Sequence, residues 1–237
     1  MYCSLVFQHM QRHQPIQVRK MVYGYIFEDS HVNIDREGEP ECRYAGSYNH
    51  LLQFKIFTAD AAVREELVEA WYRATTFHTA DPSTLASSLS RFGWRRDLNP
   101  GDLIRQDLEP LDLIRHVEVD IPIELRHGTT SQDTLVLGRL GSLCQLNKRT
   151  IIRIALEVPD RDEYTCFAEF FLVFGCDYAQ EVDYLFAPLE RLRSEGYMVI
   201  VRADQGLEFV VEPEETNVKG WAKRCRAAIT EAERSCR

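Results

Sequence analysis

Residues 111–158 constrain the fold most, because they show strand, helix and strand patterns in succession. Leu111–Ile121 alternates apolar and polar residues, 134–147 carries apolar residues at helical spacing, and 151–158 is a second strand-like run. A third strand-like run, 197–203, follows another helical pattern. Strands separated by helices in this way predict one mixed sheet through the last two thirds of the chain.

The rest of the chain predicts further elements around this sheet. Val18, Met21, Val22, Tyr25 and Ile26 share one stripe of a helix that Pro15 opens, and we expect this stripe to dock on the core. The other predicted elements are a strand over 30–35, a helix from 58 or 60 to 74, a short strand over 75–79, a helix from 81, a helix over 182–192 with Gly196 as its C-cap, a hairpin strand over 207–211 and a last helix capped by Asn217.

These elements predict an α+β fold, a mixed sheet with amphipathic helices packed on it. A loose leucine-rich-repeat-like α/β arrangement is the alternative, although the predicted strands are unequally spaced and their side chains do not recur. Residues 1–14 are interpreted as a poorly ordered lead-in, and 15–237 as a single globular domain.

Composition limits the setting and the partners. The formal net charge is -9, which does not favour binding to nucleic acid or to an anionic membrane. Seven scattered cysteines fit reduced thiols. There is no signal-like start, and the longest apolar run, 167–176, is about half the roughly 20 residues that cross a bilayer. A cytoplasmic or nuclear protein is expected.

No motif in the chain fixes a reaction. The seven histidines are dispersed, and only His9 and His13 have the i, i+4 spacing of a helical metal pair. Gly138 and Gly141 lie within a helical pattern and lack the context of a phosphate loop. We therefore expect no metal, no small-molecule cofactor and no catalytic residues.

Two alternatives remain open. An enzyme would build its site at strand ends from His116, Glu118, Asp120 and Cys166. Glu118 and Asp120 fall on one face of a strand, for which a solvated face is the simpler interpretation. A nucleic-acid-binding subunit would use basic residues on the last helix, namely Lys219, Lys223, Arg224 and Arg226.

The leading hypothesis is a non-enzymatic intracellular protein-interaction module, an adaptor or a complex subunit. Residues 36–50 form a long polar loop, and aromatic and arginine side chains are typical of interface centres. The candidate partner-binding residues are Tyr44, Tyr48, Trp94, Arg95, Arg96 and Tyr164.

Three patches also carry a family resemblance. Pro15-Ile-Gln-Val-Arg-Lys-Met-Val-Tyr-Gly-Tyr-Ile-Phe27 is similar to an opening of the form Leu-Pro-x-Glu-Leu-Arg followed by Ile-Tyr-x-Tyr. Val63–Phe77 is similar to an Arg-x-Glu helix that ends in Phe-Tyr-x-x-Asn-x-Phe, and Leu113–Val119 to an Ile-Arg-x-Leu-x-Leu strand. Together they resemble F-box-like proteins of filamentous fungi. The opening motif is partial, and a strand is predicted at His31 where a complete F-box has further helices.

This resemblance implies a non-enzymatic adaptor. Its N-terminal helix would contact a Skp1-like partner through Val18, Met21, Val22 and Tyr25.

Overall fold

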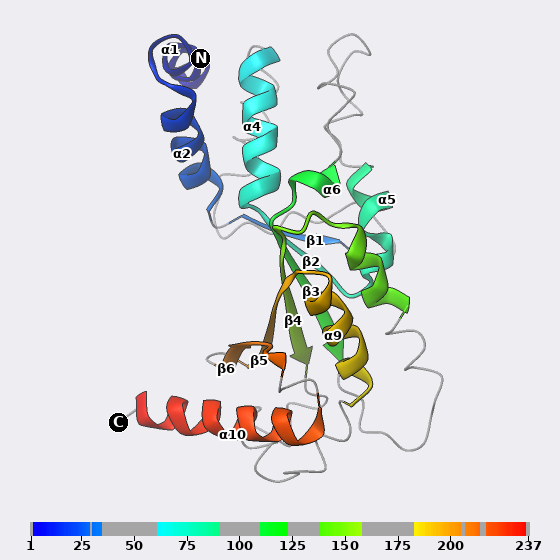
Figure 1. The fold of residues 1–237 in the computed structure, drawn as a ribbon. Coiled ribbons are helices and arrows are strands. Elements are labelled where there is room, and N and C mark those ends of the chain that lie inside the picture. The colour runs from blue at the N-terminus through cyan, green and yellow to red at the C-terminus, as the bar shows by residue number, and fades with distance from the viewer. Residues whose placement is uncertain are drawn as a thin grey trace. The chain divides into compact units, whose positions relative to one another are not determined.

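The structure is a computed structural model, and it describes residues 2–28, 30–34, 61–90, 110–122, 138–157, 183–204, 207–213 and 217–235. Six strands in these ranges form one mixed sheet whose order, β1-β2-β3-β4-β5-β6, follows the chain (Figure 1). The strands are β1 (His31–Ile34), β2 (Thr76–Thr79), β3 (His116–Pro122), β4 (Ile151–Glu157), β5 (Met198–Asp204) and β6 (Leu207–Val210). The predicted α+β class is confirmed.

Helices and helical turns account for most of the other described residues. They are α1 (Tyr2–His13), α2 (Ile16–Phe27), α4 (Ala61–Ala74), η1 (Pro82–Thr84), α5 (Leu85–Ser90), α6 (Pro110–Leu113), η3 (Ser142–Gln145), η4 (Asp183–Leu185), α9 (Phe186–Ser194) and α10 (Val218–Ser235). None of the helices in the described ranges has the length and apolar character that crossing a membrane requires.

The three strands expected to share a sheet, β3, β4 and β5, are consecutive in it. β1 pairs with β2 and β4 with β5 in parallel, whereas β6 returns antiparallel to β5, which confirms the predicted hairpin. Consecutive order is also a property of stacked α–β units. The first five strands begin at residues 31, 76, 116, 151 and 198, however, so any repeat is irregular.

The chain divides into two compact units, residues 1–79 with 84–117, and residues 80–83 with 118–237. A single domain over 15–237 was the expectation from sequence. Tyr2–His13, expected to be a poorly ordered lead-in, forms helix α1. Each unit has its own core.

The first unit is built around α4 and β2. Val63, Leu67 and Trp71 recur every four residues along α4 and are buried, so they form the inward face of this helix. The Trp71 ring meets Phe77 of β2 edge-on, with centroids 5.5 Å apart. Helices α1 and α2 pack against α4 (Figure 1).

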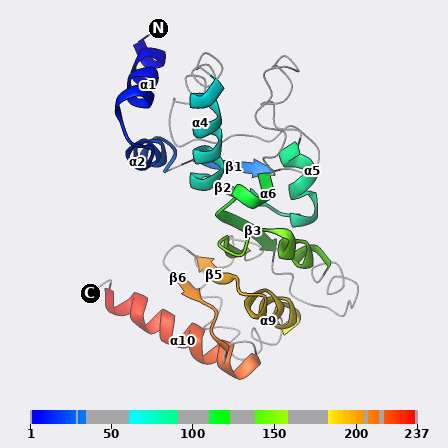
Figure 2. The same cartoon turned by 45° about the horizontal axis from the view of Figure 1, so that its top comes forward.

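The second unit packs helices on β5 and β6. Ile152 and Ile154 of β4 lie in register with Val199 and Val201 of β5, and all four side chains are buried. Helix α9 contacts β5, and α10 contacts β6 (Figure 2). Trp221 of α10 is fully buried against two rings, those of Phe209 at 5.4 Å and Phe186 at 5.5 Å.

Both predicted caps in the second unit are confirmed. The Gly220 N–H donates to Asn217 Oδ1 at 2.9 Å, so Asn217 caps α10. Gly196, at φ 93°, follows the end of α9, where its N–H donates to the Arg193 carbonyl and the Tyr197 N–H to the Leu192 carbonyl. This pair of bonds is a Schellman motif.

The strand predicted over Leu111–Ile121 is wrong in its first part. Pro110 opens the short helix α6, since its fixed φ suits the first helical position, and the strand begins only at His116. Pro188 lies in the first turn of α9, where a proline is tolerated because the backbone N–H it lacks would have no partner within the helix. The loop 36–50 and the apolar run 167–176 lie outside the described residues.

Candidate functional site

Helix α2 is apolar on two opposite faces, and only one of them packs inward. Tyr23 and Phe27, four residues apart, are fully buried. The Phe7 ring of α1 lies 5.9 Å from the Tyr23 ring. This inner face attaches α2 to its own unit.

Arg19 holds the inner face in place. Its Nε donates to Glu66 Oε2 at 2.9 Å and its Nη2 to Glu66 Oε1 at 2.5 Å, a bidentate pair with α4. Its Nη1 donates to the Gln14 carbonyl at 2.8 Å, just after the end of α1. The hydrogen bonds to Glu66 raise the pKa of Arg19 above its ordinary value. One guanidinium therefore joins three helices.

The outer face of α2 carries the residues that the F-box-like resemblance assigned to partner contact. Met21 is 65 % exposed, Tyr25 is 74 % exposed and Val18 is 40 % exposed, while Val22 is half-buried. The prediction that this stripe docks on the core is wrong. Both faces of α2 carry apolar residues. The inner face packs against the rest of the unit because it carries Tyr23, Phe27 and the ion pair of Arg19.

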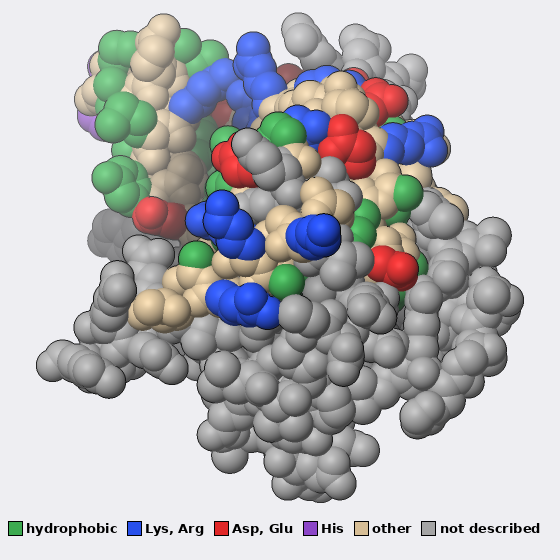
Figure 3. All heavy atoms as spheres, turned by 60° about the horizontal axis from the view of Figure 1, so that its bottom comes forward, with side chains coloured by type: hydrophobic (Ala, Val, Ile, Leu, Met, Phe, Trp, Pro, Cys, Tyr) green, Lys and Arg blue, Asp and Glu red, His purple; other side chains and the backbone are tan. Residues whose placement is uncertain are grey.

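Exposed apolar side chains concentrate on α1 and α2. The large hydrophobic residues that are exposed in the described ranges are Val6, Ile16, Val18, Met21, Tyr25, Ile26, Met198 and Val210. The first six belong to these two helices. Hydrophobic side chains gather over the same part of the molecule in Figure 3. We call Val18, Met21 and Tyr25 the outer stripe. Scattered exposed apolar residues are ordinary, whereas a cluster on one element indicates an interaction surface.

The charge around the outer stripe differs from that of the chain. Residues 1–27 contain no Asp or Glu but include Arg12, Arg19 and Lys20, in a chain whose net charge is -9. Arg12 is exposed. Lys20 lies 3.8 Å from Glu69 of α4, and its side chain is 48 % exposed. The segment that carries the stripe is therefore basic, in contrast to the rest of the chain.

The other predicted contact residues all lie outside the described ranges. These are Tyr44, Tyr48, Trp94, Arg95, Arg96 and Tyr164, together with Cys166 of the enzyme hypothesis. Their role in binding stays a prediction.

The enzyme hypothesis places its remaining residues on β3. Val117, Val119 and Ile121 point to the buried side, so His116, Glu118 and Asp120 share the other face. The Glu118 carboxylate is buried and accepts a hydrogen bond from Nη2 of Arg202 on β5. The expectation of a solvated face is therefore wrong for Glu118, whose charge is paired instead.

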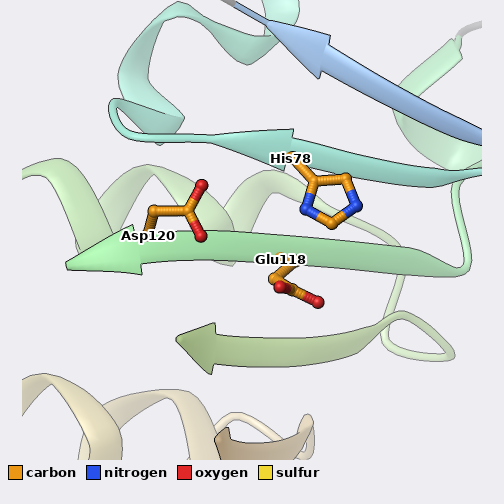
Figure 4. A group of neighbouring side chains, drawn as sticks. All are labelled: His78, Glu118 and Asp120. Atoms are coloured by element: carbon orange, nitrogen blue, oxygen red, sulfur yellow. The ribbon is translucent and has the colours of Figure 1, made fainter. Parts of the chain in front are cut away.

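Figure 4 shows Glu118 and Asp120 together with His78 of β2. His78 belongs to the first unit and the two carboxylates to the second. In its own unit, His78 is bonded to another histidine: His31 Nδ1 lies 2.8 Å from His78 Nε2.

The basic residues proposed for nucleic-acid binding stay on the surface of α10. Lys219, Lys223 and Arg226 are exposed, and Arg224 lies 5.6 Å from the Phe209 ring, measured from its Cζ to the ring centroid. Arg224 thus helps to pack the helix on β6.

The helical period alone did not show that Val6, Ile16 and Ile26 would also be exposed. Apolar residues at helical spacing do not reveal which side of a helix faces the rest of the protein. The available signal was electrostatic, namely the absence of any carboxylate from residues 1–27.

Comparisons of the chain with protein-family models, with curated proteins and with solved structures find no match.

Proposed function

We propose that this protein is a non-enzymatic interaction module, an adaptor or complex subunit, that binds a partner protein through the outer stripe of α2. The observation that carries the proposal is the exposure of Val18, Met21 and Tyr25 on a helix whose opposite face is fully buried. A helix that is anchored on one side and apolar on the other presents a preformed ridge to an apolar groove.

The charge around the ridge defines the partner. Because residues 1–27 lack carboxylates and carry Arg12 and Lys20, the complementary surface is an apolar groove bordered by Asp or Glu. A Skp1-like protein is the partner that the F-box-like resemblance implies. We include a cytoplasmic or nuclear location in this proposal, because the scattered cysteines fit reduced thiols.

The chain offers a matched pair of methionines for the test. Met21 is 65 % exposed on α2, and Met198 is 52 % exposed on β5 in the other unit. The variants Met21→Glu and Met198→Glu place the same charge at two exposed apolar positions. Neither position is buried, so circular dichroism should show both variants folded.

The experiment begins with a photo-cross-linking amino acid at position 25 and, in a separate protein, at position 198. We expect a discrete adduct with one partner from position 25 only, and loss of that adduct when Met21→Glu is added. The purified partner should bind wild type and Met198→Glu alike. Its affinity for Met21→Glu should fall by roughly tenfold or more, since a charge is then buried in an apolar interface.

Three results decide between occupants of the ridge. A purified Skp1-like protein that binds wild type and loses affinity for Met21→Glu supports the partner that the resemblance implies. An adduct with a second copy of the chain would replace the adaptor role by self-association. Equal cross-linking at positions 25 and 198, or none at position 25, refutes the proposed surface.

A further inference from the structure

A pair of histidines on neighbouring strands is the side-chain cluster that the interaction role leaves unused. His31 opens β1, and His78 lies on β2, 47 residues later in the chain. Their facing ring nitrogens, Nδ1 of His31 and Nε2 of His78, are 2.8 Å apart, and the ring centroids are 5.1 Å apart. His31 is exposed and His78 is half-buried.

The strands hold these two rings on one face. β1 and β2 are parallel, with His31 opposite Thr76 and Asn33 opposite His78. Val32, Ile34 and Phe77 are buried on the other face, so the alternation directs both imidazoles to the same side. Backbone register therefore fixes how closely the two rings can approach.

A short contact between two ring nitrogens needs something between them. With two neutral rings, one ring must donate an N–H to the lone pair of the other, because two lone pairs at this distance repel. A metal ion can take the place of that proton. Zinc bonds imidazole nitrogen at about 2.0–2.1 Å, so two nitrogens in tetrahedral geometry are about 3.3 Å apart. A small rotation of the exposed His31 ring supplies the difference of about half an ångström.

We propose that His31 and His78 form a cross-strand binding site for a divalent transition metal ion, with Zn²⁺ as the reference ion. Imidazole nitrogen selects Zn²⁺, Cu²⁺ or Ni²⁺ over Mg²⁺ and Ca²⁺, which take oxygen ligands. The ion is held by His31 Nδ1 and His78 Nε2, each in the tautomer whose proton is on the other ring nitrogen.

The site has a structural consequence for β1. Among the described strands, β1 is at the edge of the sheet and has four residues. An ion bridging His31 and His78 links this edge strand to β2 by bonds other than the backbone ladder, so it stabilises the folded state by mass action. The role is independent of the outer stripe on α2.

The test titrates the full chain, cleared of metal, with Zn²⁺ in isothermal titration calorimetry. We expect one ion per chain at this site and an affinity that is weaker by roughly tenfold or more in both His31→Asn and His78→Asn, since each keeps only one of the two imidazoles. His9→Asn combined with His13→Asn is the matched control. It removes another pair of exposed histidines, whose rings lie 4.3 Å apart on α1.

A second readout is the melting temperature, which Zn²⁺ should raise in wild type and in the control but not in the two β-strand variants. Circular dichroism checks that His31→Asn is folded, and its exposed position makes it the cleaner variant. The proposal is overturned if Zn²⁺ binds His31→Asn as tightly as wild type, if binding depends on His9 and His13 instead, or if millimolar Zn²⁺ produces neither heat nor thermal shift.

Discussion

Single side chains in this protein differ most in how their polar atoms are satisfied. The Arg19 guanidinium and the Glu118 carboxylate are both partly or fully buried, and both are paired. The hydroxyl of Tyr23 is buried without a hydrogen-bond partner in the part of the chain that the structure describes. Such a group loses its bond to water on folding and regains none, so it opposes stability.

Tyr23 also makes stability depend on alkaline pH. Burial, with a smaller contribution from the negative charge of Glu66, raises the pKa of Tyr23 from 10.0 to about 12, and Arg19 opposes this shift. The folded state keeps the phenolic proton at a pH where the unfolded chain has lost it. The contribution of Tyr23 to the free energy of unfolding is therefore fully present below pH 10 and is lost as pH rises from 10 towards 12.

We predict that Tyr23→Phe removes this alkaline loss of stability. At pH 7 the variant should be as stable as wild type or slightly more so, because it discards an unsatisfied hydroxyl. Urea unfolding at pH 7, 9 and 11 measures the difference, which should grow in favour of the variant above pH 10. Tyr25→Phe, on the exposed side of the same helix, is the control. A variant that loses stability in parallel with wild type would contradict the prediction.

Among the elements, α9 shows what local sequence specifies and α2 shows what packing specifies. The end of α9 is specified locally, since Gly196 at φ 93° allows the Schellman bonds that close the helix. The orientation of α2 is not specified by its own sequence, because both of its faces are apolar. Its rotation follows from residues on other elements, namely Glu66 on α4 and Phe7 on α1.

We predict that Gly196→Ala lowers the free energy of unfolding by about 1–2 kcal/mol, the cost of a left-handed backbone for a residue with a Cβ. No atom lies within 4 Å of the added methyl group, so the cost is conformational rather than steric. Gly138→Ala is the matched control, because Gly138 is helical and equally open. Alanine there should be neutral or stabilising by up to about 1 kcal/mol. Urea unfolding measures the change in the free energy of unfolding for both variants. Equal changes would contradict a conformational cost that is specific to Gly196.

At the scale of the whole chain, charge is distributed unevenly. The net charge is -9, yet residues 1–27 contain no acidic residue, so the remaining 210 residues carry all 37 carboxylates. Lys219, Lys223 and Arg226 give α10 an exposed basic face. Such a face on an acidic protein is a solvated helix surface more often than a nucleic-acid site.

We therefore predict no binding of a single-stranded oligonucleotide at about 150 mM salt, where long-range attraction is largely screened. Fluorescence anisotropy with a labelled oligonucleotide is the measurement. The double change Lys219→Glu and Lys223→Glu should leave the anisotropy unchanged. Micromolar binding that weakens steeply with salt, and that this double variant abolishes, would establish the nucleic-acid alternative instead.

Local sequence patterns specify most of the secondary structure of the described residues. Periods of 2 and 3.6 located β4, β5, α4 and α10, and short-range chemistry located the caps at Gly196 and Asn217. These features need only neighbours within a few positions along the chain. Leu111 to Arg115 was assigned to the wrong element, because Pro110 favours a helix start that apolar alternation does not reveal.

Long-range packing determines which apolar face is buried and which residues distant in the sequence come together. The outer stripe is exposed because the ion pair between Arg19 and Glu66 turns the opposite face of α2 inward. His31 and His78 meet because the register of β1 and β2 places them side by side across 47 residues. A periodic pattern records that a side chain is apolar or polar. Only long-range packing fixes its partner, since that depends on contacts no local segment contains.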